Sequence, residues 1–310
     1  MTQARAAAAT NRSLAPREHG AYGQLFAPML ASLLATRITF TSLAFAVAGV
    51  CAFYAHEPLL VLSGQRGARA ERELLLPAKR RAALLLGTFF VLGMAGLWIS
   101  NAQTRWAAVG VGVLGLSAAI LSHLEFLHSA FGEAWAGSVL AALGVPIALA
   151  GAMPVRLAIA IALAWSLAFA AGVFAIKGVI SYRKTTTRGG AIWGMIAVVT
   201  GLVLELKWAS GPVMAVTPLT LASVLLLIRV PSPKALRKIG WTLVGFTVLS
   251  AALMVLTARA RLFESPIGQP AAGPWKFGQN GVASNSFAKA YSFIRILASA
   301  CQIALRPPQS

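Results

Sequence analysis

AYGQLFAPMLASLLATRITFTSLAFAVAGVCAFYAH, residues 21–56, decides the fold, because it is a long apolar run in which Arg37 carries the only formal charge. A single helix of about 40 residues would be about 60 Å long. The hydrocarbon core of a bilayer is only about 30 Å thick. We therefore predict two membrane-spanning helices, over residues 21–36 and 38–56, with Arg37 in the outer turn between them.

The composition indicates an integral membrane protein. The 310 residues are 58% hydrophobic and only 11% charged, and the mean hydropathy is +0.74. Soluble domains carry about 25% charged residues, so most of this surface does not face water and the bilayer is its principal partner. The net charge of +19 comes from basic residues spread over many short segments. That spread argues against nucleic-acid binding, which needs one concentrated basic face.

A spanning helix needs about 20 mostly apolar residues, and on this measure the chain is all-α, a polytopic transmembrane bundle of about nine spans. We expect residues 16–260 to form this helical domain. Residues 1–15 are expected to be a flexible N-terminus, and residues 261–310 a loop-rich tail in which 287–305 has the pattern of an amphipathic helix. The nine expected spans are 21–36, 38–56, 82–100, 106–122, 135–153, 156–176, 190–206, 211–228 and 239–258.

The basic residues give this topology a direction. Seventeen of them fall in the N-terminal segment and in the segments after the second, sixth and eighth expected spans, against four in the opposite loops. Cytoplasmic loops carry the excess of Lys and Arg. The N-terminus of this multi-pass protein is therefore expected to be cytoplasmic.

This topology places the four histidines and six of the eight glutamates on the cytoplasmic side. Histidine titrates near neutral pH and suits proton transfer. The alternative interpretation is that these side chains are ordinary polar loop residues that cap helix ends. Candidates for acid–base or metal chemistry are Glu18, His19, His56 and Glu57.

The segment SHLEFLHS, residues 122–129, contains a weak metal motif. Glu125 and His128 have the i, i+3 spacing of carboxylate-bridged metal sites in helical bundles, and His123 is nearby. That motif needs a second copy, which the chain lacks, and the chain has no aspartate at all. Hydrogen bonding among these side chains is the competing interpretation, and the sequence identifies no cofactor.

Two basic segments suit an anionic ligand. AHEPLLVLSGQRGAR, residues 55–69, combines arginines with glycines, and arginine binds phosphate or carboxylate through two parallel hydrogen bonds. KGVISYRKTTTRGG, residues 177–190, is expected to be a similar basic loop. The competing interpretation is that both are simple cytoplasmic anchors. The candidate ligand-binding residues are Arg17, Tyr22, Arg66, Arg69, Lys177, Tyr182 and Arg183.

PREHGAYGQLFAP, residues 16–28, followed by the 55–69 segment, resembles the YwiC-like family of bacterial integral membrane proteins. The resemblance extends over about residues 14 to 260 and implies a multi-pass protein of a bacterial cytoplasmic (inner) membrane, but it brings no established activity. The residues that match the family's N-terminal pattern are Arg17, Glu18, His19, Gly20, Ala21, Tyr22 and Pro28.

The architecture is also similar to that of UbiA-type prenyltransferases, which have nine helices and two working cytoplasmic loops after helices 2 and 6. Those enzymes hold Mg²⁺-diphosphate with aspartate-rich motifs, whereas this chain has no aspartate. Two hypotheses remain. The protein binds or moves an anionic lipid-like or phosphate-bearing ligand at its cytoplasmic face, or it is a membrane enzyme of prenyltransferase type or a His/Glu metal-dependent lipid enzyme. Whether it is an enzyme is left open.

Overall fold

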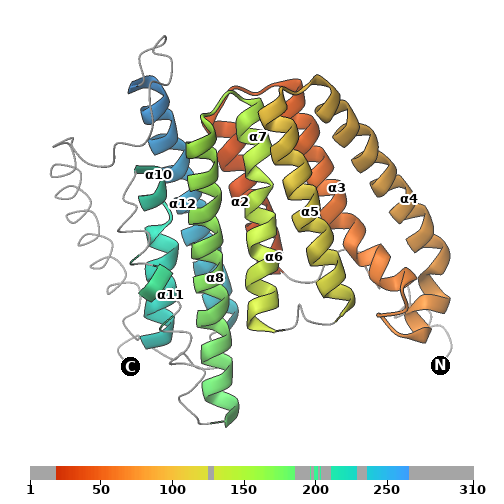
Figure 1. Ribbon diagram of the computed structural model, residues 1–310. Helices are drawn as coiled ribbons and strands as arrows, with labels where there is room; N and C mark the ends of the chain where they lie inside the picture. The colour runs from red at the N-terminus through yellow and green to blue at the C-terminus, as the bar shows by residue number, and fades with distance from the viewer. Residues whose placement is uncertain are drawn as a thin grey trace. The chain divides into compact units, whose positions relative to one another are not determined.

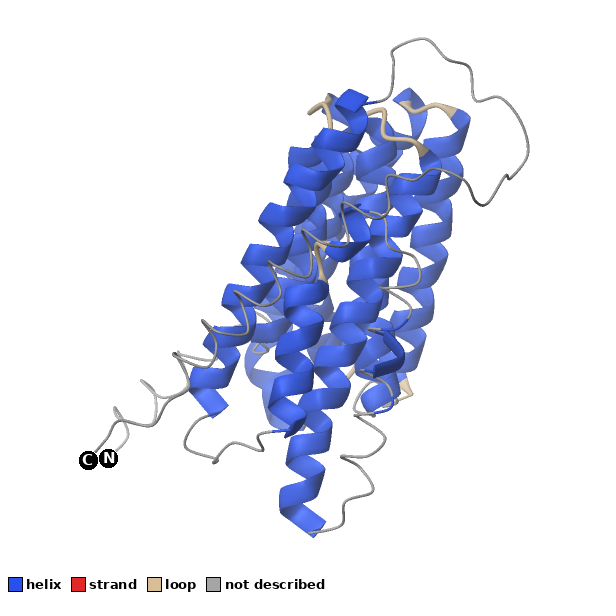
Figure 2. Cartoon of the chain, turned by 90° about the vertical axis from the view of Figure 1, so that its left-hand side faces the viewer, coloured by secondary structure: helices blue, strands red, loops and turns tan. Residues whose placement is uncertain are grey.

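The computed structural model describes residues 19–124, 129–185, 196, 199–201, 203, 211–228 and 236–264 (Figure 1). The chain divides into two compact units, Met1–Ser265 and Pro266–Ser310, and the described residues all belong to the first. Their regular structure is entirely α-helical (Figure 2), which confirms the all-α prediction. The predicted N-terminal segment 1–15 and amphipathic helix 287–305 lie outside the described residues.

Seven stretches of the described chain are long and apolar enough to cross a membrane. Helix α2, with 17 residues, is shorter than these, and most of the predicted span 190–206 lies outside the described residues. The bundle therefore agrees with the expected architecture of about nine spans. The helices are α2 (His19–Ala35), α3 (Phe40–Leu62), α4 (Ala68–Ile99), α5 (Ala102–His123), α6 (Ala130–Ala142), α7 (Gly144–Ala150), α8 (Val155–Thr185), α10 (Gly211–Met214), α11 (Thr217–Ile228) and α12 (Leu236–Glu264).

The turn predicted at Arg37 is confirmed, because α2 ends at Ala35 and α3 begins at Phe40. Thr39 starts the new helix with a capping box. The backbone N–H of Ser42 donates to Thr39 Oγ1, and the backbone N–H of Thr39 donates to Ser42 Oγ. These two bonds satisfy N–H groups that a helix start leaves unpaired. The apolar run is thus divided by a local polar signal as well as by its length.

Three helices extend well beyond the spans predicted from hydropathy. Helix α3 continues to Leu62, α4 begins at Ala68 instead of residue 82, and α8 continues to Thr185. The predictions of long basic loops after the second and sixth spans were therefore wrong. Hydropathy marks only the part of a helix that lies in lipid, whereas the Ala, Arg, Glu and Leu residues of 68–81 are strong helix formers in any environment.

The main core lies where α2, α7, α8, α11 and α12 meet. Helix α3 pairs with α4, α6 packs on α8, and α2 packs on α12. Many of the buried residues are alanines, around the fully buried Trp165 and Met254. Small residues let transmembrane helices approach closely. Helix α5 has no buried residue in its most apolar stretch, so this side of the bundle faces lipid.

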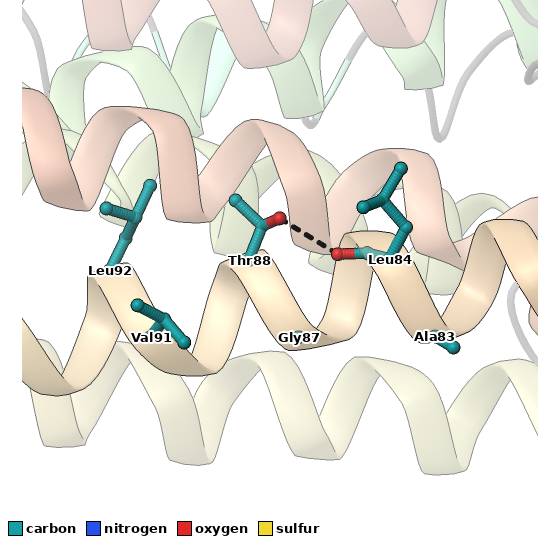
Figure 3. Close-up of a pocket in the computed structure, with 6 residues that line it drawn as sticks. All are labelled: Ala83, Leu84, Gly87, Thr88, Val91 and Leu92. Carbon is teal, nitrogen blue, oxygen red and sulfur yellow. Dashed lines mark hydrogen bonds between the residues drawn. The ribbon is translucent and has the colours of Figure 1, made fainter.

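A shallow depression runs along one face of α4 (Figure 3). Its only polar side chain, Thr88, donates a hydrogen bond to the Leu84 carbonyl of its own helix at 2.9 Å. The surface is therefore apolar and suits lipid chains better than a polar solute. The lining residues are Ala83, Leu84, Gly87, Thr88, Val91 and Leu92.

Close packing of α3 on α4 should be sensitive to one glycine. A Cβ on Gly96 would lie 2.9 Å from the ring of Phe45, whereas a Cβ on Gly93 would have no atom within 4 Å. We expect Gly96→Ala to lower the free energy of unfolding by about 1–2 kcal/mol through overpacking. The control Gly93→Ala should be neutral or slightly stabilising, because alanine favours helix. Equilibrium unfolding of the purified protein in detergent measures both, and equal effects would contradict the packing argument.

Two of the spans are broken part-way. The α6–α7 span is interrupted at Leu143 and the α10–α11 span at residues 215–216. A proline follows each break, and proline has no N–H to donate. The Ala142 carbonyl therefore cannot bond to residue 146, and the Met214 carbonyl cannot bond to residue 218.

Candidate functional site

The polar side chains named by the sequence analysis collect at one end of the bundle. The α3–α4 turn, the end of α5, the start of α6 and the end of α8 all lie at the lower end in Figure 1. We call it the inner end, since the charge pattern predicts that it is cytoplasmic. His56 and His123 lie here, as expected. Arg105 and Arg156 lie near the opposite ends of their helices, and Arg37 lies in the turn between α2 and α3.

A buried carboxylate anchors this end. The side chain of Glu57 on α3 is 7% exposed, and its Oε2 lies 2.5 Å from Nη2 of Arg66, whose side chain is 40% exposed. Arg66 reaches back over α3 because residues 63–67 form a tight turn. Gly64 and Gly67 adopt φ of +75° and +85° in it, a conformation that suits glycine. The pair therefore depends on the turn as much as on the charges.

An aromatic cluster lies beside this pair. The ring of Tyr22 on α2 is 5.6 Å from that of Phe53 and 6.1 Å from that of Tyr54, both on α3. The Tyr22 side chain also interacts electrostatically with Tyr54, with Arg81 of α4 and with Glu57. Three helices thus bring polar groups together at one place. We call it the tyrosine–arginine site and define it as Tyr22, Tyr54, Glu57, Arg66 and Arg81.

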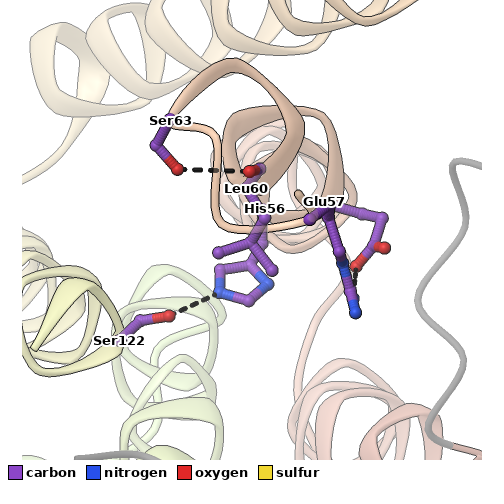
Figure 4. Close-up of polar contacts among 6 residues, drawn as sticks. His56, Glu57, Leu60, Ser63 and Ser122 are labelled. Carbon is purple, nitrogen blue, oxygen red and sulfur yellow. Dashed lines mark hydrogen bonds and ion pairs between the residues drawn. The ribbon is translucent and has the colours of Figure 1, made fainter. Parts of the chain in front are cut away.

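His56 and Glu57 are neighbours in sequence but have different partners. His56 Nε2 lies 3.1 Å from Ser122 Oγ of α5, whereas Glu57 points away from Ser122 in a different direction (Figure 4) and pairs with Arg66. His123 Nδ1 is 3.0 Å from the Gln65 side-chain nitrogen. These hydrogen bonds join the inner ends of α3 and α5. The geometry therefore does not bring His56 and Glu57 together as an acid–base pair.

Two other candidate cations also have glutamate partners. Lys177 Nζ lies 2.6 Å from Glu133 Oε1, a pair that joins α8 to α6. Arg69 Nε lies 2.8 Å from Glu73 Oε1, one turn along α4. Helix α8 packs on α6 and α11, whereas α4 packs on α3. The structure therefore links Tyr22 to Arg66 only through Glu57, with which both interact. It pairs Lys177 with a different part of the inner end.

Several candidates cannot be placed. Among the described residues, no group of three His, Cys, Asp or Glu side chains could hold a metal ion. Two of the three residues suggested for a metal lie outside that part of the chain, so the metal site stays a prediction. Outside the described residues are Arg17, Glu18, Glu125 and His128, together with the side chains of His19, Tyr182 and Arg183.

The sequence analysis missed Arg81 and Tyr54. Arg81 was expected in a loop, but it lies on α4 next to the buried Ala78 and Ala82. Residues three and four apart share one face of a helix, so Ala78 marks the face of α4 on which Arg81 lies. This signal becomes readable only once residues 68–81 are recognised as helix.

Part of the sequence matches the model of a known protein family. Residues 15–147 match the model of the family described as YwiC-like protein. Over this region the chain is similar to that family. The resemblance carried by PREHGAYGQLFAP is thereby confirmed, although the match ends well before residue 260. It contains all five residues of the tyrosine–arginine site. No curated protein and no solved structure matches the chain. Together with the seven apolar helices of the described chain, the match makes this a multi-pass membrane protein.

Proposed function

We propose that the protein binds an anionic, lipid-like or phosphate-bearing ligand at the tyrosine–arginine site. The observation that carries the proposal is the position of Arg81. Its guanidinium interacts electrostatically with Tyr22 of the family motif, as does Glu57 of the Glu57–Arg66 pair. Guanidinium groups are well suited to phosphate and carboxylate groups.

The Glu57–Arg66 pair is compatible with ligand binding. A guanidinium has five N–H donors, and the hydrogen bond between Arg66 and Glu57 uses Nη2. The Arg66 side chain is 40% exposed, so its other donors can reach a ligand. Glu57 then orients the arginine, as a carboxylate partner commonly does for a binding group.

The surrounding charge favours an anion. Residues 57–81 contain six basic and three acidic side chains. Among the described residues, glutamates pair with Arg66 and Arg69, while Arg72, Lys79, Arg80 and Arg81 add further positive charge along α4. A surface with this excess attracts anions and raises their local concentration.

The neighbouring apolar surface favours a ligand with a lipid chain. The depression on α4 begins at Ala83, two residues after Arg81, and continues to Leu92. Eleven residues of helix from Arg81 to Leu92 span about 16 Å. If the head group of a lipid bound at Arg81, its hydrocarbon chain would lie along this apolar depression.

The charge of Arg81 can be tested against that of its neighbour. Arg81 is half-buried beside Tyr22, whereas Arg80 is exposed. We expect Arg81→Gln to lower the retention of phosphatidylglycerol about tenfold, because it removes a charge-assisted hydrogen bond. Arg80→Gln, which removes the same formal charge, should change retention less than twofold. Native mass spectrometry of the detergent-purified protein, with phosphatidylcholine as the uncharged-lipid control, measures both.

Equal losses from the two variants would reduce the site to a diffuse positive surface and overturn the proposal. A competition experiment with inorganic phosphate tests which part of the lipid is recognised. If it displaces phosphatidylglycerol from the wild type, the site recognises the phosphate group itself. If it does not, the lipid chain is part of what is recognised.

A further inference from the structure

Three deeply buried polar side chains lie far from the inner end. Trp165 of α8 and Ser250 of α12 are 0% exposed, and Thr217, at the start of α11, is 4% exposed. Trp165 Nε1, Thr217 Oγ1 and Ser250 Oγ have no hydrogen-bond partner in the described part of the chain. Buried polar groups are nearly always paired, with protein or with water.

Trp165 and the start of α11 lie at the same depth. A Cβ on Gly172 of α8 would be 3.8 Å from Ser223 Oγ of α11, so these two residues are level. Helices α8 and α11 run in the same direction (Figure 1). Two turns back along each helix lead to Trp165 on α8 and to Val216, next to Thr217, on α11. Trp165 and Val216 accordingly belong to one packed cluster.

Ser250 reaches this depth from the other side. A Cβ on Gly211 would be 3.7 Å from Thr257 Cβ of α12. Seven residues back from Thr257, on the same face of α12 and about 10 Å away, lies Ser250. The α10–α11 span runs antiparallel to α12, and on it Thr217 lies six residues after Gly211. The three unpaired groups therefore lie at similar depths along three helices of the bundle.

The break between α10 and α11 lies at this level. The Met214 carbonyl cannot accept from Pro218, so the backbone here has an acceptor without its helical donor. Other hydroxyls of the same helices are satisfied internally. Ser223 donates to the Leu219 carbonyl at 3.0 Å, and Thr257 donates to the Leu253 carbonyl at 2.8 Å. Among the described residues, one other buried side-chain atom lacks a partner, Thr104 Oγ1 of α5, which belongs to a different part of the bundle.

We propose that a water-sized, neutral hydrogen-bonding molecule binds here, accepting from Trp165 Nε1–H and bridging the hydroxyls of Thr217 and Ser250. A buried water typically makes about three hydrogen bonds to such groups. The molecule is neutral, because the surrounding cluster consists of apolar side chains and an unpaired ion in such surroundings is strongly disfavoured. It ties the broken span to α8 and α12. This proposal does not depend on the ligand of the tyrosine–arginine site.

The wild-type protein tests the proposal directly. In a detergent sample labelled with ¹⁵N-tryptophan, Trp165→Phe identifies the Trp165 indole signal by its loss. We expect a nuclear Overhauser cross-peak between this buried N–H and water in the wild type. An indole N–H that gives no water cross-peak, with the protein folded, would overturn the proposal.

A double-mutant cycle provides an independent test. If Thr217 and Ser250 share one bound molecule, Thr217→Val and Ser250→Ala should each raise the unfolding equilibrium constant about tenfold, and so should the double variant, because the first substitution already disrupts the bridge. The control pair is Ser223→Ala and Thr257→Val, whose hydroxyls bond within their own helices. Here the fold-change of the unfolding equilibrium constant in the double variant should equal the product of the two single fold-changes. If the fold-changes also multiplied for Thr217→Val and Ser250→Ala, the two hydroxyls would not share a bound molecule, and the proposal would be overturned.

Discussion

Gly151→Ala should destabilise the bundle by about 3 kcal/mol, at the upper end of the usual cost of overpacking. Gly151 lies in the turn between α7 and α8, where it meets the turn between α2 and α3. A Cβ there would overlap Thr36 Oγ1 and lie 2.8 Å from the Arg37 carbonyl oxygen. The backbone N–H of Arg37 also donates to the Gly151 carbonyl at 3.4 Å. Because one of the obstructing atoms is backbone, a side-chain rotation cannot relieve the clash.

Gly110→Ala is the matched control, since a Cβ on Gly110 of α5 would have no atom within 4 Å. This substitution should be neutral or stabilise by up to about 1 kcal/mol, through the better helix propensity of alanine. The midpoint of denaturant unfolding of the purified protein distinguishes the two variants. A Gly151→Ala protein as stable as the wild type would show that the two turns are not packed as described.

Arg66→Met should lower the free energy of unfolding by about 2–3 kcal/mol. Removing one partner of a buried ion pair costs about 3–5 kcal/mol, because the other charge remains buried and unpaired. The lower figure applies here because Arg66 is 40% exposed, although Glu57 is only 7% exposed. Adding Glu57→Leu to Arg66→Met removes the stranded carboxylate, so the double variant should recover most of the loss.

Arg69→Met is the control for this pair. Its partner Glu73 lies one turn away on the same helix, and the Arg69 side chain is 77% exposed, so its loss should have little effect on stability. Thermal unfolding of the four proteins in one detergent compares them. If the double variant were less stable than Arg66→Met, Glu57 would be stabilised by groups other than Arg66.

Hydropathy and charge were sufficient to predict the bundle, because the bilayer imposes a length on every span. The turn at Arg37 could be predicted for the same reason. The extent of α4 could not, since half of its first 14 residues are charged and only their helix propensity indicates their conformation. This error also affected the prediction of the site. Because residues 68–81 were expected to be a loop, the neighbours of Arg81 could not be predicted.

The contacts of the site depend on geometry that spacing does not reveal. Glu57 and Arg66 are nine residues apart, and they meet because Gly64 and Gly67 turn the chain back sharply. His56 and Glu57 were both candidates for acid–base or metal chemistry, but adjacent helical residues point about 100° apart, and the two side chains have different partners. Tyr22 was recognised through its motif, whereas its neighbour Tyr54 depends on how α2 crosses α3. The unpaired Trp165 gave no signal in the sequence, because a buried tryptophan normally finds a partner.

The two ends of helix α4 indicate the thickness of the membrane that the protein fits. Its inner end has Lys79, Arg80 and Arg81, and its outer end has the exposed Trp98. The 17 residues between Arg81 and Trp98 correspond to about 26 Å of helix. Arginine and tryptophan both settle at the boundary between head groups and hydrocarbon, so the two ends fit a hydrocarbon layer slightly thinner than the average of about 30 Å. In a thicker bilayer the bundle must thin its surroundings or withdraw one of its anchors from the boundary.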